Sequence, residues 1–113
     1  MESKFYVSLK AARLLKEKGY DEKTDFFIDE YGIWKWDGRA ILDLPCPTKA
    51  EAMDWLESKG IVVEAYYSKK ATWLFYISTR NLIELYDSFD ELVFPTRLEA
   101  ENAAIIKALE LLK

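Results

Sequence analysis

The sequence predicts an α+β domain in which helices pack on one face of a mainly antiparallel sheet. Three segments have helical spacing of apolar residues behind a start signal, and two pairs of β-rich segments flank short polar turns. The expected order is helix, strand, strand, helix, strand, strand, a short helix or loop, and helix. Because 113 residues, half of them hydrophobic, can build one buried core, we expect residues 1–113 to form a single domain.

The first helix is expected at Ser8–Lys18. The Ser8 hydroxyl can accept a hydrogen bond from the free amides of the first turn. Gly19 should end the helix, because glycine adopts the left-handed conformation without steric cost. The apolar stripe that faces the core consists of Leu9, Ala11, Ala12, Leu14 and Leu15.

A first hairpin is expected within residues 25–37, where two short β-rich segments flank a polar turn that ends in Gly32. Trp34 and Trp36 would share one face of its second strand, since side chains alternate along a strand. Residues 38–47 follow as a connector. We expect apolar side chains to hold it against the domain: Ile41, Leu42 and Leu44.

Two nearly identical stretches, Pro47–Ala52 and Pro95–Ala100, precede the other two helices. In each, a Thr at the N-cap is followed three residues later by a Glu, which is the spacing of a capping box. The repeat is therefore interpreted as the same way of starting a helix, ahead of an internal duplication or a functional motif. One helix should run from Thr48 to about Ser58, and the last one onward from Thr96.

The clearest strands are Ile61–Ser68 and Ala71–Thr79, in which hydrophobic and other residues alternate. The polar turn between them favours an antiparallel hairpin. Residues 80–94 are ambiguous, because their apolar residues follow helical spacing, and we expect a short helix or a loop there.

The residue types exclude several chemistries. Without His, the chain has no Ser–His or Cys–His nucleophile, and its one cysteine, Cys46, lies between two prolines as an apolar filler. No glycine-rich phosphate loop and no metal-ligand spacing occurs, so we predict no catalytic, cofactor or metal residues. Paired carboxylates are the one enzymatic route left, and those near the first hairpin are Asp25, Asp29, Glu30 and Asp37.

The net charge of −4 argues against a nucleic-acid partner, whose binding face is normally basic. The apolar runs are too short to span a membrane, and the first residues lack the apolar region of a signal peptide. We therefore expect a cytoplasmic protein without a membrane partner.

Aromatic residues are numerous for a domain of this size. They either complete the core or form an uncovered platform for a partner protein or a second copy. We predict an interaction surface from these residues: Trp34, Trp36, Tyr66, Trp73 and Tyr76. The leading hypothesis is a non-enzymatic protein-interaction domain. The alternative is a small-ligand binder or minor enzyme that uses the carboxylates near the first hairpin.

Three stretches, Val7–Asp21, Pro47–Leu56 and Glu99–Leu112, together resemble a family of small uncharacterised proteins from phages, prophages and gut Bacteroidetes genomes. The resemblance does not extend to residues 24–44 or 80–94. It implies a small cytosolic accessory protein of mobile-element origin, and it implies no activity or binding residues.

Overall fold

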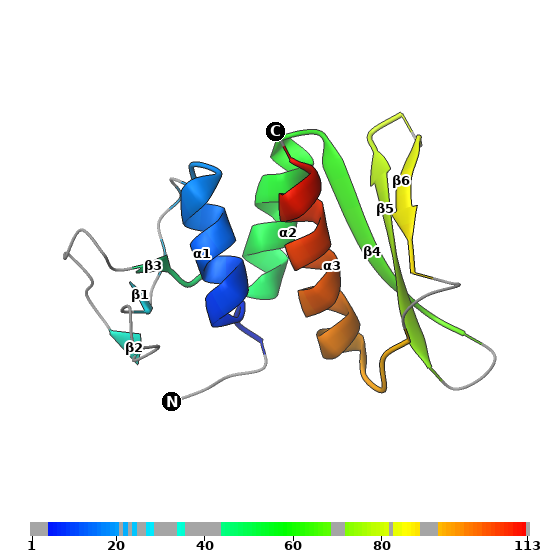
Figure 1. Ribbon diagram of the computed structural model, residues 1–113, viewed down its shortest axis with the longest axis horizontal. Coiled ribbons are helices and arrows are strands. Elements are labelled where there is room, and N and C mark those ends of the chain that lie inside the picture. Colours follow the sequence, from blue (N-terminus) through cyan, green and yellow to red (C-terminus); the bar gives the residue numbers. More distant parts are fainter. Residues whose placement is uncertain are drawn as a thin grey trace.

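The computed structural model describes residues 5–20, 22, 24, 27–28, 44–68, 72–81, 83–88 and 93–112, and the backbone of residues 34–35 (Figure 1). The three helices and six strands within these described residues confirm the α+β class. In chain order the elements are α1 (Leu9–Glu17), β1 (Phe27–Ile28), β2 (Trp34–Lys35), β3 (Leu44–Pro45), α2 (Lys49–Ser58), β4 (Ile61–Tyr67), β5 (Trp73–Thr79), β6 (Glu84–Asp87) and α3 (Arg97–Leu111).

The strands form two separate antiparallel sheets, in the orders β2-β1-β3 and β4-β5-β6. Both expected hairpins are present: β1 pairs with β2, and β4 pairs with β5 in a register that places Val63 opposite Ile77. The connector contributes a strand that the sequence did not indicate, because Leu44 pairs with Ile28. Leu44 is buried, as expected, and Ile41 and Leu42 lie outside the described residues.

The expectation of a short helix or a loop at residues 80–94 is wrong for residues 84–87, which form strand β6. This strand pairs with the side of β5 that β4 leaves open, with a bulge between Ile77 and Ser78. The pairing gives the short segment backbone hydrogen bonds that its helical spacing of apolar residues could not supply alone.

The three helices begin where the sequence indicates. The amide of Ala11 donates to Ser8 Oγ (3.3 Å), and Gly19 adopts a φ of 87° at the other end of α1. The capping box is complete at Thr48: its hydroxyl accepts from the Glu51 amide (3.1 Å), and its own amide donates to the Glu51 carboxylate (2.9 Å). At the start of α3, the Thr96 hydroxyl accepts a hydrogen bond from the Glu99 amide in the same way (3.2 Å).

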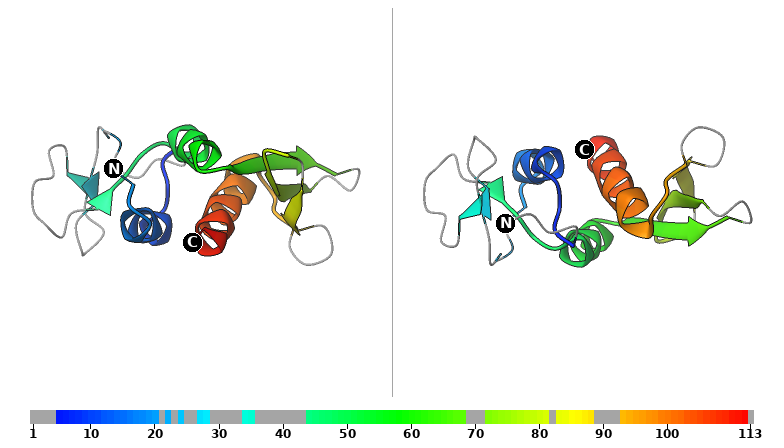
Figure 2. Two further views of the ribbon diagram at one scale, coloured as in Figure 1. Left: turned by 90° about the horizontal axis from the view of Figure 1, so that it is seen from above. Right: turned by 90° about the horizontal axis from the view of Figure 1, so that it is seen from below.

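The elements lie in successive layers, with the small sheet at one end, then α1, then α2 and α3, and the large sheet at the other end (Figure 2). Helices α2 and α3 pack against the same face of the large sheet, and both contact β4. The core between these layers contains Val63, Phe75 and Ile77 from the sheet and Ile105 and Leu109 from α3. The opposite face of the sheet turns away from the helices.

Candidate functional site

Of the five aromatic residues that the sequence groups as an interaction surface, the structure describes the side chains of three. Trp34 lies in β2, described by its backbone, and Trp36 lies outside the described residues. The carboxylates near the first hairpin (Asp25, Asp29, Glu30 and Asp37) also lie outside them. The other three aromatics belong to the large sheet, and all three are half-buried: Tyr66, Trp73 and Tyr76.

Tyr66 and Tyr76 share the outer face of the sheet, and Trp73 lies on the helix-facing side. Opposite residues of an antiparallel pair share a face. Tyr66 is opposite Leu74, and Tyr76 is opposite Glu64, so these four side chains point outward. Trp73 has the parity of the core residue Phe75 and points to the other side.

The Tyr66 side chain reaches across the middle strand of the sheet. Its hydroxyl donates a 2.8 Å hydrogen bond to Asp87 Oδ1 on β6, although Tyr66 itself belongs to β4. A side chain that connects these two strands has to cross β5, where Leu74 is opposite Tyr66. Leu74 is only 2% exposed although it points away from the helices. Tyr66 therefore covers part of the outer face and is not a free platform.

Tyr67 is the exposed aromatic residue of the large sheet, and it is not among the five residues predicted from the sequence. It is 59% exposed, at the last position of β4. Its ring meets that of Trp73 edge-to-face, with centroids 5.2 Å apart. The signal for this residue was its place at the end of the strand, just before the polar turn. Together Tyr67 and Trp73 form an aromatic end to the sheet.

Among the described residues, no strand pairs with the edge of β4 that lies opposite β5. Trp73 on β5 exchanges both of its backbone hydrogen bonds with Phe94 (2.7 and 2.9 Å), so it has none left for Tyr67, its opposite residue on β4. Bonded and non-bonded positions alternate along an antiparallel pair. Four residues of β4 therefore have N–H and C=O groups that point away from β5, in the plane of the sheet: Ile61, Val63, Ala65 and Tyr67. Within the described part of the chain, β5 is the only strand paired with β4. The N–H and C=O groups of these four residues are called the β4 edge below.

A groove of about 250 Å³ runs beside the β4 edge. One wall is formed by Val62 and Val63 of β4. The other wall is one face of α2, with residues at the i, i+3, i+4 and i+7 spacing of a helix surface. This wall, called the α2 stripe below, consists of Ala50, Met53, Asp54 and Glu57.

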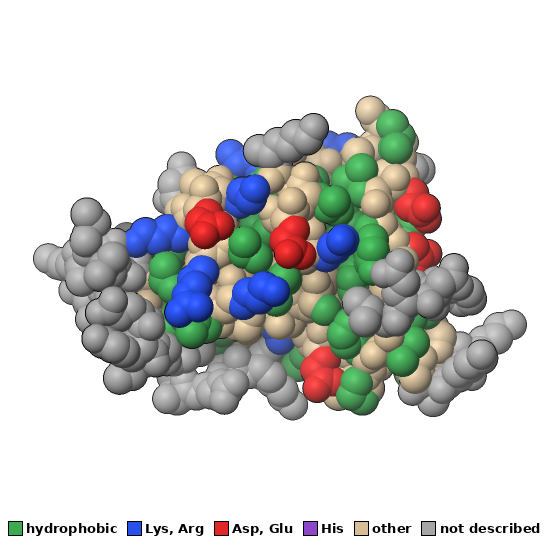
Figure 3. Space-filling view, in the orientation of Figure 1, with side chains coloured by type: hydrophobic (Ala, Val, Ile, Leu, Met, Phe, Trp, Pro, Cys, Tyr) green, Lys and Arg blue, Asp and Glu red, His purple; other side chains and the backbone are tan. Residues whose placement is uncertain are grey.

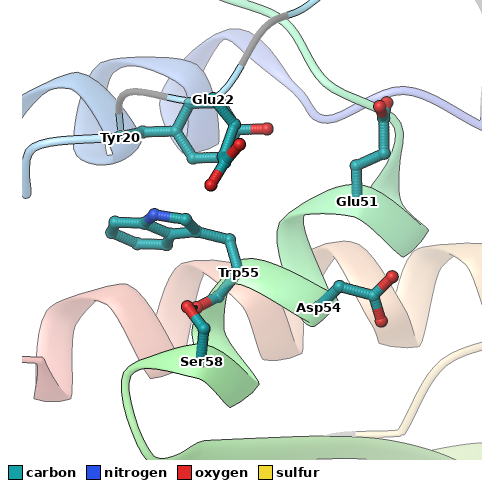
Figure 4. Close-up of a pocket in the computed structure, with 6 residues that line it drawn as sticks. All are labelled: Tyr20, Glu22, Glu51, Asp54, Trp55 and Ser58. Carbon is teal, nitrogen blue, oxygen red and sulfur yellow. Dashed lines mark hydrogen bonds between the residues drawn. The ribbon is translucent and has the colours of Figure 1, made fainter.

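A second cavity, of about 320 Å³, lies between α2 and the end of α1 (Figure 4). The rings of Tyr20 and Trp55 meet edge-to-face inside it, with centroids 5.3 Å apart. Trp55 is only 4% exposed, so its ring belongs mainly to the core. Glu51 is engaged with Thr48, and the carboxylates of Glu51 and Asp54 point away from the indole (Figure 4). The carboxylates of the described residues that line the cavity, Glu22 included, therefore do not converge on one point for acid–base chemistry.

Among the described residues, two ionisable groups have shifted pKa values, and both are buried. Burial raises the pKa of the Cys46 thiol to about 12, and its Sγ lies 3.7 Å from the Val7 carbonyl oxygen. Burial also lowers the pKa of Lys49, against the opposing effect of Glu101 and Glu99 at the start of α3. Cys46 is thus a protonated core residue, as the flanking prolines suggested.

The described residues contain neither a candidate metal site nor a candidate membrane-spanning helix. No group of three or more His, Cys, Asp or Glu residues there could hold a metal ion. No described helix has the length and apolar character needed to cross a membrane. Basic side chains gather over α1 on the face shown in Figure 3, and they belong to a chain whose net charge is −4. The β4 edge, with its groove and its aromatic end, is the best-defined candidate site.

Comparison with models of known protein families, with curated proteins and with solved structures found no match for this chain.

Proposed function

We propose that this chain is a non-enzymatic protein-interaction domain that binds an extended segment of a partner as an additional strand on the β4 edge. The observation that carries the proposal is the row of outward backbone groups on Ile61, Val63, Ala65 and Tyr67. A second strand satisfies such a row, because its own N–H and C=O groups have the same spacing.

The surroundings of the edge support this mode of binding. β4 has seven residues and contains neither proline nor lysine, which natural edge strands use to prevent pairing. The exposed Tyr67 ring, held against Trp73, offers apolar contact area at one end of the strand. The groove beside β4 leaves room for side chains of the incoming segment.

Three further elements of the proposal come from the sequence alone. The resemblance to small phage and prophage proteins makes a host or phage protein the expected partner, in the cytoplasm. Self-association is the second form that a protein contact at this edge would take. A small-ligand or enzymatic role for Asp25, Asp29, Glu30 and Asp37 has no supporting observation among the described residues.

Selection from a displayed library of linear peptides tests the proposal. Peptides should be enriched on the wild-type protein and not on Ala65→Pro, which removes one outward N–H and leaves the bonds between β4 and β5 in place. Circular dichroism and thermal unfolding should show that this variant keeps the fold.

Amide hydrogen exchange on the wild-type protein gives a second measurement that does not depend on the variant. A selected peptide should protect the amides of Ile61, Val63, Ala65 and Tyr67, which point outward in the free protein. Protection elsewhere, or the absence of any enriched peptide, would overturn the proposal.

A further inference from the structure

We infer that the strand accepted by the β4 edge is a basic segment, with lysine or arginine alternating with apolar residues. This inference rests on the proposed function and adds the chemical class of the partner. It follows from what the two sides of an added strand would meet.

An added strand presents alternate side chains to opposite faces of the sheet. On the helix side it faces the α2 stripe, where Ala50 and Met53 are apolar and Asp54 and Glu57 are acidic. On the outer face of the sheet, the charged residue of β4 that lies beside the added strand is Glu64, because β4 carries no other charged residue. Asp54, Glu57 and Glu64 are all exposed. Both faces of the added strand would therefore lie near carboxylates.

Among the described residues, cations compensate these carboxylates little. None of the described residues that line the groove is lysine or arginine. Arg80 lies at one end of α2, and its guanidinium donates to the main-chain carbonyl of Glu57 (2.7 and 3.1 Å). The groove thus keeps an excess of negative charge, and lysine or arginine in the added strand would be attracted to it.

The same charges disfavour a second copy of this chain as the occupant. Two β4 strands paired antiparallel about Glu64 would place Glu64 opposite its own copy, and like charges in directly opposite positions destabilise a sheet. A two-fold axis perpendicular to the sheet would also bring both α2 stripes to the same side. Asp54 and Glu57 of one copy would then approach those of the other.

Two labelled probe peptides test the inference by fluorescence anisotropy. One alternates Val and Lys, the other alternates Val and Glu, and both are long enough to pair with the seven residues of β4. The Val–Lys peptide should bind about tenfold more tightly at moderate salt, because several exposed ion pairs each contribute a small stabilisation. Added salt should reduce this preference. A peptide that is N-methylated at every second amide should not bind if the methylated amides are those that face β4. It should still bind if they are the amides that face away from β4.

Charge reversal on the groove wall tests the inference from the protein side, and charge reversal on α1 is the matched control. Asp54→Lys and Glu57→Lys should each reduce the preference for the basic peptide severalfold. Glu17→Lys changes the net charge equally on α1, away from the groove, and should leave the preference unchanged.

Each result decides a separate question. Equal binding of both peptides, with the N-methylation pattern intact, would overturn the inference and leave the proposed function standing. Failure of both probes to bind would overturn the inference, and the library selection would then judge the proposed function by itself. A dimer in light scattering that is lost in Ala65→Pro would show that a second copy occupies the edge, which would also overturn it.

Discussion

The Lys18 ammonium group, just beyond the last residue of α1, donates a 2.6 Å hydrogen bond to the main-chain carbonyl of Leu112, just beyond the end of α3. At the start of α1, the Ser8 amide donates to the side chain of Asn102, which lies in the first half of α3 (3.3 Å). The two contacts link residues ten positions apart on each helix, so α1 and α3 run parallel and in register (Figure 1). Lys18 therefore supplies a cation at the negative end of the α3 dipole.

Replacing Lys18 with Met should lower the free energy of unfolding by about 1 kcal/mol, since a hydrogen bond from a charged group and a favourable dipole interaction are both lost. Chemical denaturation measures the change. Lys10→Met, at an exposed position of the same helix, is the control and should change stability by less than about 0.5 kcal/mol. Equal effects of the two variants would mean that the contact with Leu112 contributes nothing.

Tyr66→Phe should destabilise the domain by about 1 kcal/mol, because it removes the hydroxyl that joins β4 to Asp87 on β6. Tyr76→Phe removes a hydroxyl from the same face of the sheet, without a bond to Asp87, and should be nearly neutral. Thermal unfolding distinguishes them. Combining Tyr66→Phe with Asp87→Asn should cost less than the sum of the single changes if the two groups interact.

Thr48→Ala and Thr96→Ala should each cost about 1 kcal/mol of stability, because each removes a hydroxyl that accepts from a first-turn amide. Peptide binding at the β4 edge should stay unchanged in the folded variants, since both residues act at helix starts. A binding defect in a variant that remains folded would show that the repeated Pro-Thr-x-x-Glu-Ala stretches have a role in binding.

The Cys46 thiol should resist alkylation in the native protein and react once the protein is unfolded. Its pKa is about 12 in the folded state, against 9.0 for an exposed thiol. The folded state thus prefers the protonated form, and the stability due to this preference is complete below pH 9 and is lost as the pH rises toward 12. Mass spectrometry after alkylation at pH 9, with and without denaturant, measures the reactivity. Rapid alkylation of the native protein would contradict the assigned burial.

The sequence indicated the local features well, because their physical causes are local. The helix starts at Ser8, Thr48 and Thr96 follow from side chains that bond to amides within three residues. The hairpin of β4 and β5 follows from alternation on both sides of a polar turn. The face on which Trp73 lies also follows from this alternation.

The candidate site was predicted less well, because it depends on contacts between distant parts of the chain. Tyr66 was predicted to be part of an exposed aromatic surface. Its hydroxyl instead reaches Asp87, twenty-one residues later, and the side chain lies across β5. Tyr67 looks like its equal in the sequence and is the one that stays exposed. Which of two adjacent tyrosines is exposed depends on the tertiary contacts of each side chain, since Tyr66 reaches Asp87 and Tyr67 stands at the last position of β4.

The sequence by itself determined the α+β class, the three helix starts and the pairing of β4 with β5, since capping, periodicity and turn chemistry act over a few residues. Only the tertiary structure decided that residues 84–87 form a strand and that Leu44 joins the small sheet. It also decided that β4 is an edge strand in the described part of the chain, with β5 on one side and no strand on the other. Strand pairing satisfies backbone groups at any sequence distance, so the residues of a single strand do not reveal which of its two sides finds a partner.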